Sequence, residues 1–254
     1  MSTINRNGVE IYYEFHQKGV EFPTILLSHG YSATSAMWQG QIEALTQDHN
    51  LITWDMRGHG QSDSPDDPSL YAESHTVADM AAILDTCDVE HAIVGGLSLG
   101  GYMTLAFQLA YPTRCDALLL LDTGPGYKND EARQGWNDTA EGRAQALETQ
   151  GLAALGTGSE VRMAQHRSAK GLALAARGML AQVDDRIIHS LPEIAVPVLV
   201  LVGADDKPFR IPTDYMTNKI PHARKVIIAD AGHASNIDQP AAFNAAVLEF
   251  LATL

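Results

Sequence analysis

The stretch Gly96-Leu97-Ser98-Leu99-Gly100 decides how this chain folds. An apolar run, Ala92-Ile93-Val94, precedes it, and residues 102–110 after it are compatible with a helix. A glycine–x–serine–x–glycine sequence between a strand and a helix is typical of a very sharp turn that exposes the serine as a nucleophile. The residues two before and two after the serine have to be small, and Gly96 and Gly100 meet that requirement. The alternative is an ordinary glycine-rich turn that contains a serine by chance.

Short apolar runs alternate with helical patterns on both sides of this motif. Residues 117–121 are continuously apolar, as expected of a strand that is buried on both faces. Alternating strands and helices with buried strands indicate an α/β fold, in which helices cover both faces of a mostly parallel sheet, here of eight strands. The predicted strands are an edge pair around 9–15, then 24–27, 51–54, 92–94, 117–121, 198–202 and 224–228, and the predicted helices are 36–45, 76–87, 102–110 and 240–251.

Residues 124–195 interrupt this series. They contain no strand-like run, and Leu, Met and Ala recur in them at helical spacing. Because the stretch is too long for a loop, we expect a helical cap inserted after the sixth strand, with residues 1–123 and 196–254 forming the core. A flexible linker is the alternative. The predicted helices of the insertion are 131–150, 160–170 and 172–180.

The composition is that of an ordinary globular protein. The 254 residues are 45% apolar and 19% charged, which is sufficient for one large core. The net charge of −14 argues against nucleic acid or an anionic membrane as a partner. Cys87 and Cys115 are predicted to be buried free thiols, as in a reducing compartment, and no Cys/His cluster suggests a metal site. Residues 1–14 lack the features of a signal peptide, so we expect a cytoplasmic protein without a membrane partner.

A serine hydroxyl becomes a strong nucleophile only when a base takes its proton and an acid orients that base. With this type of turn, the order along the chain is serine, acid, histidine. Of the ten histidines, only His233 follows the last predicted strand, in the loop Asp230-Ala231-Gly232-His233-Ala234. We predict His233 as the base, and a histidine of an ordinary surface loop is the alternative.

The acid is predicted among three aspartates. Asp205 and Asp206 follow the next-to-last strand, at the carboxyl edge of the sheet where functional sites collect. Their side chains diverge, so one at most faces His233, and we favour Asp206 over Asp205. Asp122, at the end of the sixth strand, is the third alternative, but we expect it to hydrogen-bond the turn that starts the cap.

The negative charge that develops on a carbonyl oxygen under attack needs hydrogen-bond donors that are fixed in advance. We predict two backbone N–H groups for this oxyanion hole. One belongs to Leu99, directly after the serine, and the other to Tyr31, in the loop after the strand 24–27.

Two further polar segments are interpreted as structural. His29, next to the predicted oxyanion residue, is expected to hold its own loop by a hydrogen bond. The segment Asp55-Met56-Arg57-Gly58-His59-Gly60-Gln61-Ser62 is expected to be a buried loop in which Asp55 and Arg57 pair and the glycines adopt unusual backbone angles. A phosphate-binding loop is the alternative, although the spacing matches neither dinucleotide-binding nor Walker patterns.

With Ser98, Asp206 and His233 in this order and both polar loops in place, the chain resembles the α/β-hydrolase superfamily over nearly all residues outside the cap. The segments 55–62 and 96–101 are most similar to those of 3-oxoadipate enol-lactonases and related bacterial carboxylesterases. The resemblance implies cleavage of an ester or lactone, without a cofactor, through an acyl-enzyme on Ser98.

Neighbouring groups of this superfamily differ at specific positions. Haloalkane dehalogenases and epoxide hydrolases carry an aspartate where this chain has Ser98. Carbon–carbon bond hydrolases usually carry His-Gly-x-Gly-Pro-Gly where this chain has His29-Gly30-Tyr31-Ser32-Ala33-Thr34. Cofactor-free haloperoxidases commonly carry a proline at the position of Ser32. These differences disfavour all of these groups.

We therefore predict a serine hydrolase whose partner is a small-molecule ester or lactone. Cleavage of a carbon–carbon bond in a diketone-type ring-fission product and a ligand sensor with the hydrolase fold are the alternatives. Trp136, Met163, Met179 and Leu180 are candidates for lining a cap pocket, with Trp136 and Met163 predicted to bind substrate, although each of the four is equally suited to packing between cap helices. The sequence leaves the oligomeric state open, with a homodimer as one alternative. The cap arginines, either solvated or in contact with an acidic substrate, are Arg133, Arg143, Arg162, Arg167 and Arg177.

Overall fold

The computed structural model describes residues 2–254, so that Met1 lies outside the description. Its centre is an eight-stranded sheet in the order β1-β2-β4-β3-β5-β6-β7-β8. The β1–β2 and β2–β4 pairs are antiparallel and the other pairs are parallel, which confirms the predicted mostly parallel sheet. The strands are β1 (Ser2–Arg6), β2 (Val9–His16), β3 (Thr24–Ser28), β4 (Asn50–Trp54), β5 (Ala92–Leu97), β6 (Cys115–Leu121), β7 (Val198–Gly203) and β8 (Ala223–Ile228).

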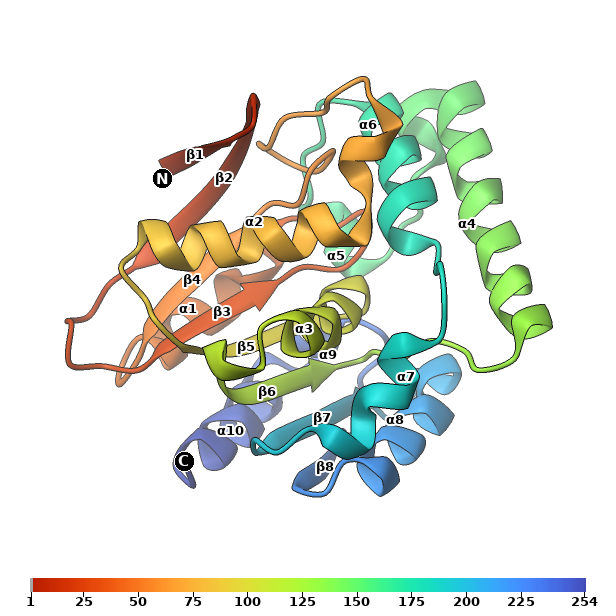
Figure 1. The fold of residues 1–254 in the computed structure, drawn as a ribbon. Coiled ribbons are helices and arrows are strands. Elements are labelled where there is room, and N and C mark those ends of the chain that lie inside the picture. The colour runs from red at the N-terminus through yellow and green to blue at the C-terminus, as the bar shows by residue number, and fades with distance from the viewer. Residues whose placement is uncertain (1) are drawn as a thin grey trace.

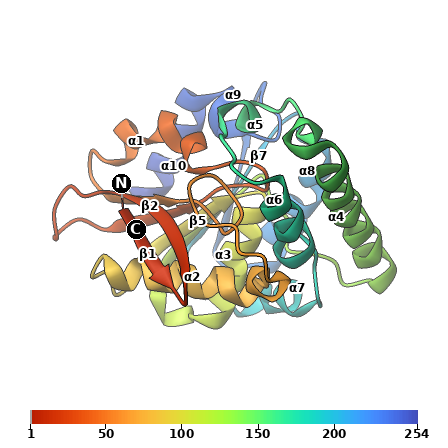
Figure 2. The same cartoon turned by 90° about the horizontal axis from the view of Figure 1, so that it is seen from above.

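Helices cover both faces of the sheet (Figure 1). Figure 2, seen from above, shows α1 and α10 on one side of the sheet and α2, α3 and α7 on the other. Each face has its own apolar cluster, and β3, β4, β5 and β7 are buried along their whole length between the two clusters. The helices of these layers are α1 (Gln39–Leu45), α2 (Glu73–Thr86), α3 (Leu99–Ala110), α7 (Arg186–Ser190), α8 (Lys207–Lys219), α9 (Ser235–Asp238) and α10 (Pro240–Leu251).

The chain between β6 and β7 is helical, which confirms the predicted insertion after the sixth strand. In Figure 1 its helices α4, α5 and α6 lie beyond the carboxyl ends of the parallel strands. Its treatment as a separate cap domain with the boundaries 124 and 195 stays a prediction. The elements before α7 are α4 (Asp130–Gln150), α5 (Ser159–Met163), α6 (Ala169–Ala175) and the π-helical turn η5 (Ala176–Leu180).

The predicted helix 160–170 is wrong, because α5 ends at Met163 and a new helix begins six residues later. The Ser168 hydroxyl accepts a hydrogen bond from Gly171 N–H at 2.9 Å, so this serine caps the start of α6. The side chains of His166 and Arg167 in between are hydrogen-bonded to loops of the core rather than aligned along a helix. Within residues 2–254, no helix combines the length and the apolar character that crossing a membrane requires.

Two glycines allow α3 to begin directly against the sheet. A Cβ atom added to Gly96 would collide with the backbone of Gly100, and one added to Gly100 would collide with the backbone carbonyl of Ser28 at the end of β3. Neither obstacle is a flexible side chain, so the contact cannot be relieved by a change of rotamer. The strand, the turn and the helix can therefore adopt this arrangement only with glycine at both positions.

We expect Gly100→Ala to lower the free energy of unfolding by at least about 1–3 kcal/mol, because the added methyl group overlaps backbone atoms. Gly135→Ala is the matched control: a Cβ there meets nothing within 4 Å, in the middle of α4. That change should stabilise the protein by about 0.5–1 kcal/mol. Urea denaturation of the three proteins measures both effects, and equal stability of Gly100→Ala and the wild type would contradict the steric explanation.

Candidate active site

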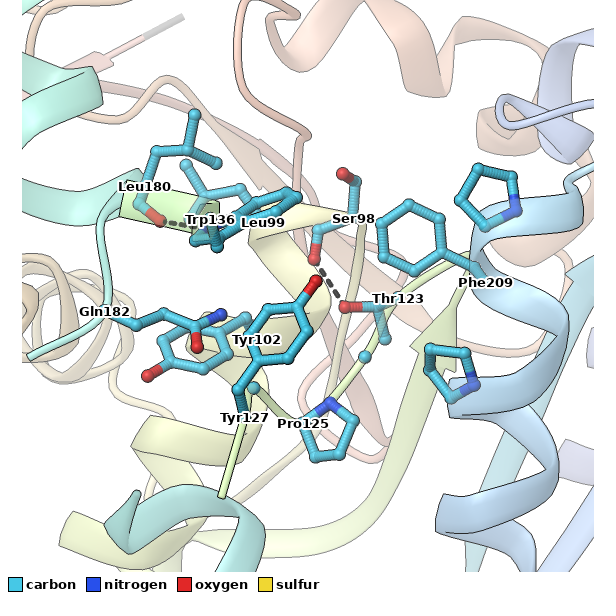
Figure 3. Close-up of a pocket in the computed structure, with 14 residues that line it drawn as sticks. Ser98, Leu99, Tyr102, Thr123, Pro125, Tyr127, Trp136, Leu180, Gln182 and Phe209 are labelled. Atoms are coloured by element: carbon cyan, nitrogen blue, oxygen red, sulfur yellow. Dashed lines mark hydrogen bonds between the residues drawn. The ribbon is translucent and has the colours of Figure 1, made fainter. Parts of the chain in front are cut away.

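Ser98 occupies a strained turn between β5 and α3. Its backbone angles are φ 57° and ψ −115°, in a region that residues with a side chain rarely adopt. Hydrogen bonds hold the turn: Ser98 N–H donates to Leu121 O at 2.9 Å, and the Thr123 hydroxyl donates to Ser98 O at 2.6 Å. Figure 3 shows the Ser98 hydroxyl pointing away from Thr123. The neighbouring loops thus fix the backbone of this serine while its hydroxyl stays free.

His233 and Asp206 lie in contact, as predicted for a base and its acid. Asp206 Oδ2 accepts a hydrogen bond from His233 Nδ1 at 2.8 Å, so the other ring nitrogen, Nε2, is left for a different partner. Asp206 is buried at 4% exposure, whereas the neighbouring Asp205 is exposed and donates its N–H to Ala231 O. Of the two adjacent aspartates, the structure places only Asp206 against the imidazole.

The environment changes the pKa of His233 in opposite directions. Burial lowers the pKa, while the hydrogen bond and the negative charge of Asp206 raise it, and the outcome is a pKa above the ordinary value. The Phe209 ring stacks on the imidazole with centroids 4.8 Å apart. The side chain nevertheless keeps 34% of its surface exposed, so it remains accessible to a substrate.

The hydrogen bonds of Asp122 differ from our prediction. We expected Asp122 to bind the turn that starts the cap, but Oδ1 accepts from Gly203 N–H at 2.7 Å and Oδ2 from the Ser235 hydroxyl. Gly203 ends the strand before Asp206, and Ser235 follows His233 by two residues. Asp122 therefore joins the two loops that carry the aspartate–histidine pair. Burial raises the pKa of this carboxyl to about 7, because its two hydrogen bonds only partly offset the loss of hydration.

Ser98 and the aspartate–histidine pair are linked through Phe209 rather than through a shared pocket lining. Phe209, which stacks on His233, lines the pocket together with Ser98 (Figure 3). In the part of the chain that the structure describes, no hydrogen bond yet joins the Ser98 hydroxyl to His233. Catalytic hydrogen bonds are often long without substrate and shorten in the complex, so a proton transfer between the two residues stays a prediction.

The predicted oxyanion loop lies against the serine. A Cβ placed on Gly30 would lie 3.4 Å from Ser98 Cβ, so glycine at this position allows the loop to approach closely. Among residues 2–254, the N–H groups of Tyr31 and Leu99 find no hydrogen-bond acceptor. His29 holds the loop as predicted, since its Nε2 accepts from Met56 N–H at 2.9 Å.

The predicted pair of Asp55 and Arg57 is wrong. The Arg57 guanidinium binds both oxygens of Asp79 on α2, at 2.6 and 2.8 Å, and both side chains are buried. Asp55 instead accepts from the backbone N–H groups of Ser35 and Gln61 at 2.7 and 2.8 Å. Because the chain turns after β4, the Arg57 side chain reaches α2, whereas the Asp55 side chain binds backbone groups of the neighbouring loops.

Three histidines pack against the loop that carries Tyr31. The His59 ring lies 5.0 Å from His29 and 5.8 Å from His166 between ring centroids, and it meets Tyr31 edge-on at 5.6 Å. His166, from the helical insertion, bonds Ser32 O and Gly60 N–H. Burial, together with the neighbouring histidines, places the pKa of His59 well below its ordinary value. The cluster is therefore neutral at physiological pH and ties the insertion to the core.

The pocket beside Ser98 contains one of the two predicted substrate-binding residues. Trp136 lines it, and so does Leu180, whereas Met163 at the end of α5 does not. Sequence reasoning missed five polar or aromatic contacts of the site: Thr123, Gln182 and Phe209, together with Tyr102 and Tyr127. Thr123 and Phe209 follow Asp122 and Asp206 closely in sequence, which was a usable signal. Nothing in the sequence pointed to Gln182. The complete lining is Ser98, Leu99, Tyr102, Thr123, Gly124, Pro125, Gly126, Tyr127, Trp136, Leu180, Gln182, Pro208, Phe209 and Pro212.

The two cysteines are free, as predicted, and Cys115 is buried while Cys87 is half-buried. Burial raises the pKa of both thiols, that of Cys87 to about 11 and that of Cys115 to about 12, so neither is an activated nucleophile. In the described range 2–254, no three His, Cys, Asp or Glu side chains are grouped so that they could hold a metal ion.

Comparisons with known proteins agree with this architecture. Residues 23–176 match a family model described as alpha/beta hydrolase fold. 3-Oxoadipate enol-lactonase 1 of Acinetobacter baylyi is 30% identical over 240 residues, which cover 87% of this chain and 85% of that protein. A putative 2-succinyl-6-hydroxy-2,4-cyclohexadiene-1-carboxylate synthase of Bacillus subtilis is 28% identical over 249 residues, which cover 91% and 90%. The structure of a thermophilic esterase from Thermogutta terrifontis has a TM-score of 0.83 and 27% identity, covering 99% of this chain and 96% of that one.

The low pKa of His59 predicts a stability that depends on pH. In the unfolded chain the imidazole of His59 takes up a proton near pH 6.5, but in the folded protein it does not, so protonation favours unfolding. The contribution of His59 to the free energy of unfolding is therefore complete above pH 6.5 and is lost as the pH falls below it. We expect His59→Asn, which cannot titrate, to lose about 1.4 kcal/mol less free energy of unfolding than the wild type between pH 7.5 and 5.5. Urea denaturation at both pH values measures this difference. Identical losses would show that His59 has the same pKa in the folded and the unfolded chain, and would contradict the effect of burial.

Proposed function

Because the chain belongs to the α/β-hydrolase fold family, as the sequence predicted, we propose that it is a serine hydrolase that cleaves a carboxylic ester or a lactone through an acyl-enzyme on Ser98. The proposal is carried by the hydrogen bond between His233 and Asp206 beside the pocket that Ser98 lines. An enol-lactonase of similar sequence and an esterase of similar structure support this choice of reaction.

Acylation begins with a proton transfer. Neutral His233 takes the hydroxyl proton of Ser98 on Nε2 while the oxygen attacks the ester carbonyl. Asp206, hydrogen-bonded to Nδ1, fixes the tautomer of His233 and stabilises the imidazolium that forms. The imidazolium then gives its proton to the leaving alkoxide, and the acyl group stays on the serine oxygen.

The tetrahedral intermediate carries its negative charge near the oxyanion loop. The N–H groups of Tyr31 and Leu99, which have no acceptor within residues 2–254, are the proposed donors to this oxygen. Such fixed donors cost no reorganisation when the charge develops, and one of them lowers the barrier by roughly 2.7–4 kcal/mol. In deacylation, His233 takes a proton from water, the hydroxide attacks the acyl-enzyme, and Ser98 recovers its proton as the acid leaves.

Ser98→Ala is expected to abolish the hydrolysis of 4-nitrophenyl acetate and of simple lactones, because no nucleophile remains. The far-UV circular dichroism spectrum should be unchanged, since alanine keeps the backbone of the turn. Ser69→Ala, at an exposed serine far along the chain from the site, is the control and should retain full activity. Turnover of Ser98→Ala near the wild-type level would end the proposal. A wild type that cleaves a dienoate ring-fission product but none of these esters would favour carbon–carbon bond hydrolysis instead.

The raised pKa of His233 predicts the pH profile. Since the base must be neutral, kcat/KM should fall as the pH drops through a value above 6.5, the ordinary pKa of the imidazole. Asp206→Asn removes the charge that raises this pKa, so the acidic limb should move to lower pH, and kcat should fall by about 10⁴. Asp205→Asn, at the exposed neighbouring carboxylate, should change neither quantity. A pH profile of Asp206→Asn that coincides with that of the wild type would exclude the proposed role.

A further inference from the structure

The proposed oxyanion donor, the backbone N–H of Tyr31, belongs to a tight turn of four residues. Ala33 N–H donates to Gly30 O at 3.1 Å and closes the turn, with Tyr31 and Ser32 between them. Because a trans peptide group is planar, the Gly30 carbonyl and the Tyr31 N–H lie in one plane and point in opposite directions. The contacts that hold Gly30 O in this turn therefore also set the direction of the Tyr31 N–H.

Ser32 has a backbone conformation that is unfavourable for a residue with a side chain. Its φ angle is 60°, in the left-handed region. Turns with a positive φ at the third residue usually have glycine there, because glycine has no Cβ to clash. The Ser32 hydroxyl donates to Tyr31 O at 2.6 Å, but both groups belong to the turn itself. A strained residue of this kind persists only where groups outside the turn hold it.

His166, from the helical insertion, holds Ser32 from outside the turn. Its Nε2 donates to Ser32 O at 3.0 Å, and its Nδ1 accepts from Gly60 N–H at 3.2 Å. An imidazole that donates from Nε2 and accepts on Nδ1 is neutral and in a single tautomer, and the two bonds fix its ring. The insertion thus reaches the strained residue across 134 positions of the sequence.

The insertion also holds the side chain of Tyr31. Its Oη donates to Leu172 O on α6 at 2.9 Å, and only 7% of the residue is exposed. The Tyr31 N–H, in contrast, has no acceptor within residues 2–254. The insertion therefore binds the tyrosine side chain and the carbonyl of the next residue and leaves the N–H between them unused. This arrangement suits a donor that is fixed in advance for a developing negative charge.

We propose that His166 is a positioning residue of the oxyanion hole: by holding Ser32 O, it keeps the strained turn closed and the Tyr31 N–H directed at the oxygen under attack. The proposal rests on the ester hydrolysis proposed above for its role in turnover. It gives the helical insertion a part in the chemical step, in addition to its part in the wall of the pocket beside Ser98.

Two substitutions separate the two hydrogen bonds of His166. The amide of His166→Gln reaches about as far as Nε2 and donates to Ser32 O, whereas the shorter amide of His166→Asn reaches only as far as Nδ1 and accepts from Gly60. We expect His166→Asn to lower kcat for 4-nitrophenyl acetate at least tenfold with little change in KM, and His166→Gln to retain most of the activity. The loss should stay below the roughly 10²–10³-fold that removal of a whole donor costs. The reverse order, or full activity of His166→Asn, would overturn the proposal.

A transition-state analogue distinguishes a misdirected N–H from a general loss of structure. When 1,1,1-trifluoro-4-phenylbutan-2-one reacts with Ser98, the serine oxygen bonds to the carbonyl carbon, the serine proton passes to His233, and the carbonyl oxygen becomes negative. 4-Phenylbutan-2-one has the same skeleton and binds as a ketone. We expect His166→Asn to weaken inhibition by the fluorinated ketone at least tenfold and to leave inhibition by the plain ketone unchanged. Equal weakening of both, or of neither, would overturn the proposed role.

Arg167→Met is the matched control for a loosened insertion. The Arg167 guanidinium binds Gly60 O and Gln61 O, so it joins the insertion to the loop of residues 55–62 without touching the turn. We expect this variant to keep kcat and both inhibition constants of the wild type. A loss as large as that of His166→Asn would overturn the assignment of the effect to Ser32 O.

Ser32→Gly tests the strain itself. Glycine adopts a φ of 60° without strain, so the turn should stay closed without the bond from His166. We therefore expect His166→Asn to lower kcat several-fold less in the Ser32→Gly background than in the wild type. An equal loss in both backgrounds would overturn the explanation by strain at Ser32.

This proposal and the proposed reaction fail separately. A wild type that hydrolyses no ester and binds both ketones equally would overturn the reaction. A wild type that hydrolyses esters and prefers the fluorinated ketone, with His166→Asn unchanged in both respects, would retain the reaction and overturn the role of His166.

Discussion

The architecture depends on a single close contact between backbones at the start of α3. Gly96 and Gly100 allow the helix to begin against the end of β3, and this packing forces Ser98 into its positive φ angle. The strain is maintained because the hydrogen bonds to Leu121 and from Thr123 fix the turn from both sides. A residue whose backbone is held in an unfavourable conformation by its surroundings has the direction of its side chain from the turn fixed before any substrate binds.

Asp122, at the end of β6, connects this turn to the segments that follow β7 and β8. Its carboxylate receives hydrogen bonds from the end of β7 and from the start of α9, so that three chain segments meet at one buried group. Removing a carboxyl from water is unfavourable, as its raised pKa of about 7 reflects. Two directed hydrogen bonds offset part of this cost and, in return, set the spacing between the loops of Asp206 and His233. This buried carboxyl therefore aligns the loops of Asp206 and His233 with the end of β6.

Local patterns in the sequence were sufficient to predict the sheet, the insertion and the proximity of His233 to Asp206. Continuous apolar runs indicate strands that are buried on both faces of the sheet. The carboxyl ends of parallel strands lie at one edge of the sheet, so residues that follow different strands meet there. Contacts between distant segments were not predictable in this way. Arg57 pairs with Asp79 on α2, and helix 160–170 is interrupted because its middle residues bind core loops. Neither partner can be deduced from spacing, since both depend on how complete layers pack.

The substrate pocket illustrates the same division between local pattern and tertiary packing. The proposed reaction uses groups at strand ends, which every member of such a fold can place similarly, whereas selectivity depends on side chains of the helical insertion. Several arginines of that insertion suggested an acidic substrate, yet Arg177 binds Glu141 and Glu148, and Arg143 lies in another cavity. The wall beside the serine is instead largely apolar, and the insertion contributes Tyr127, Trp136 and Leu180 to it. A chain can therefore resemble lactonases in its strand-end motifs while its own insertion forms much of the wall beside the serine.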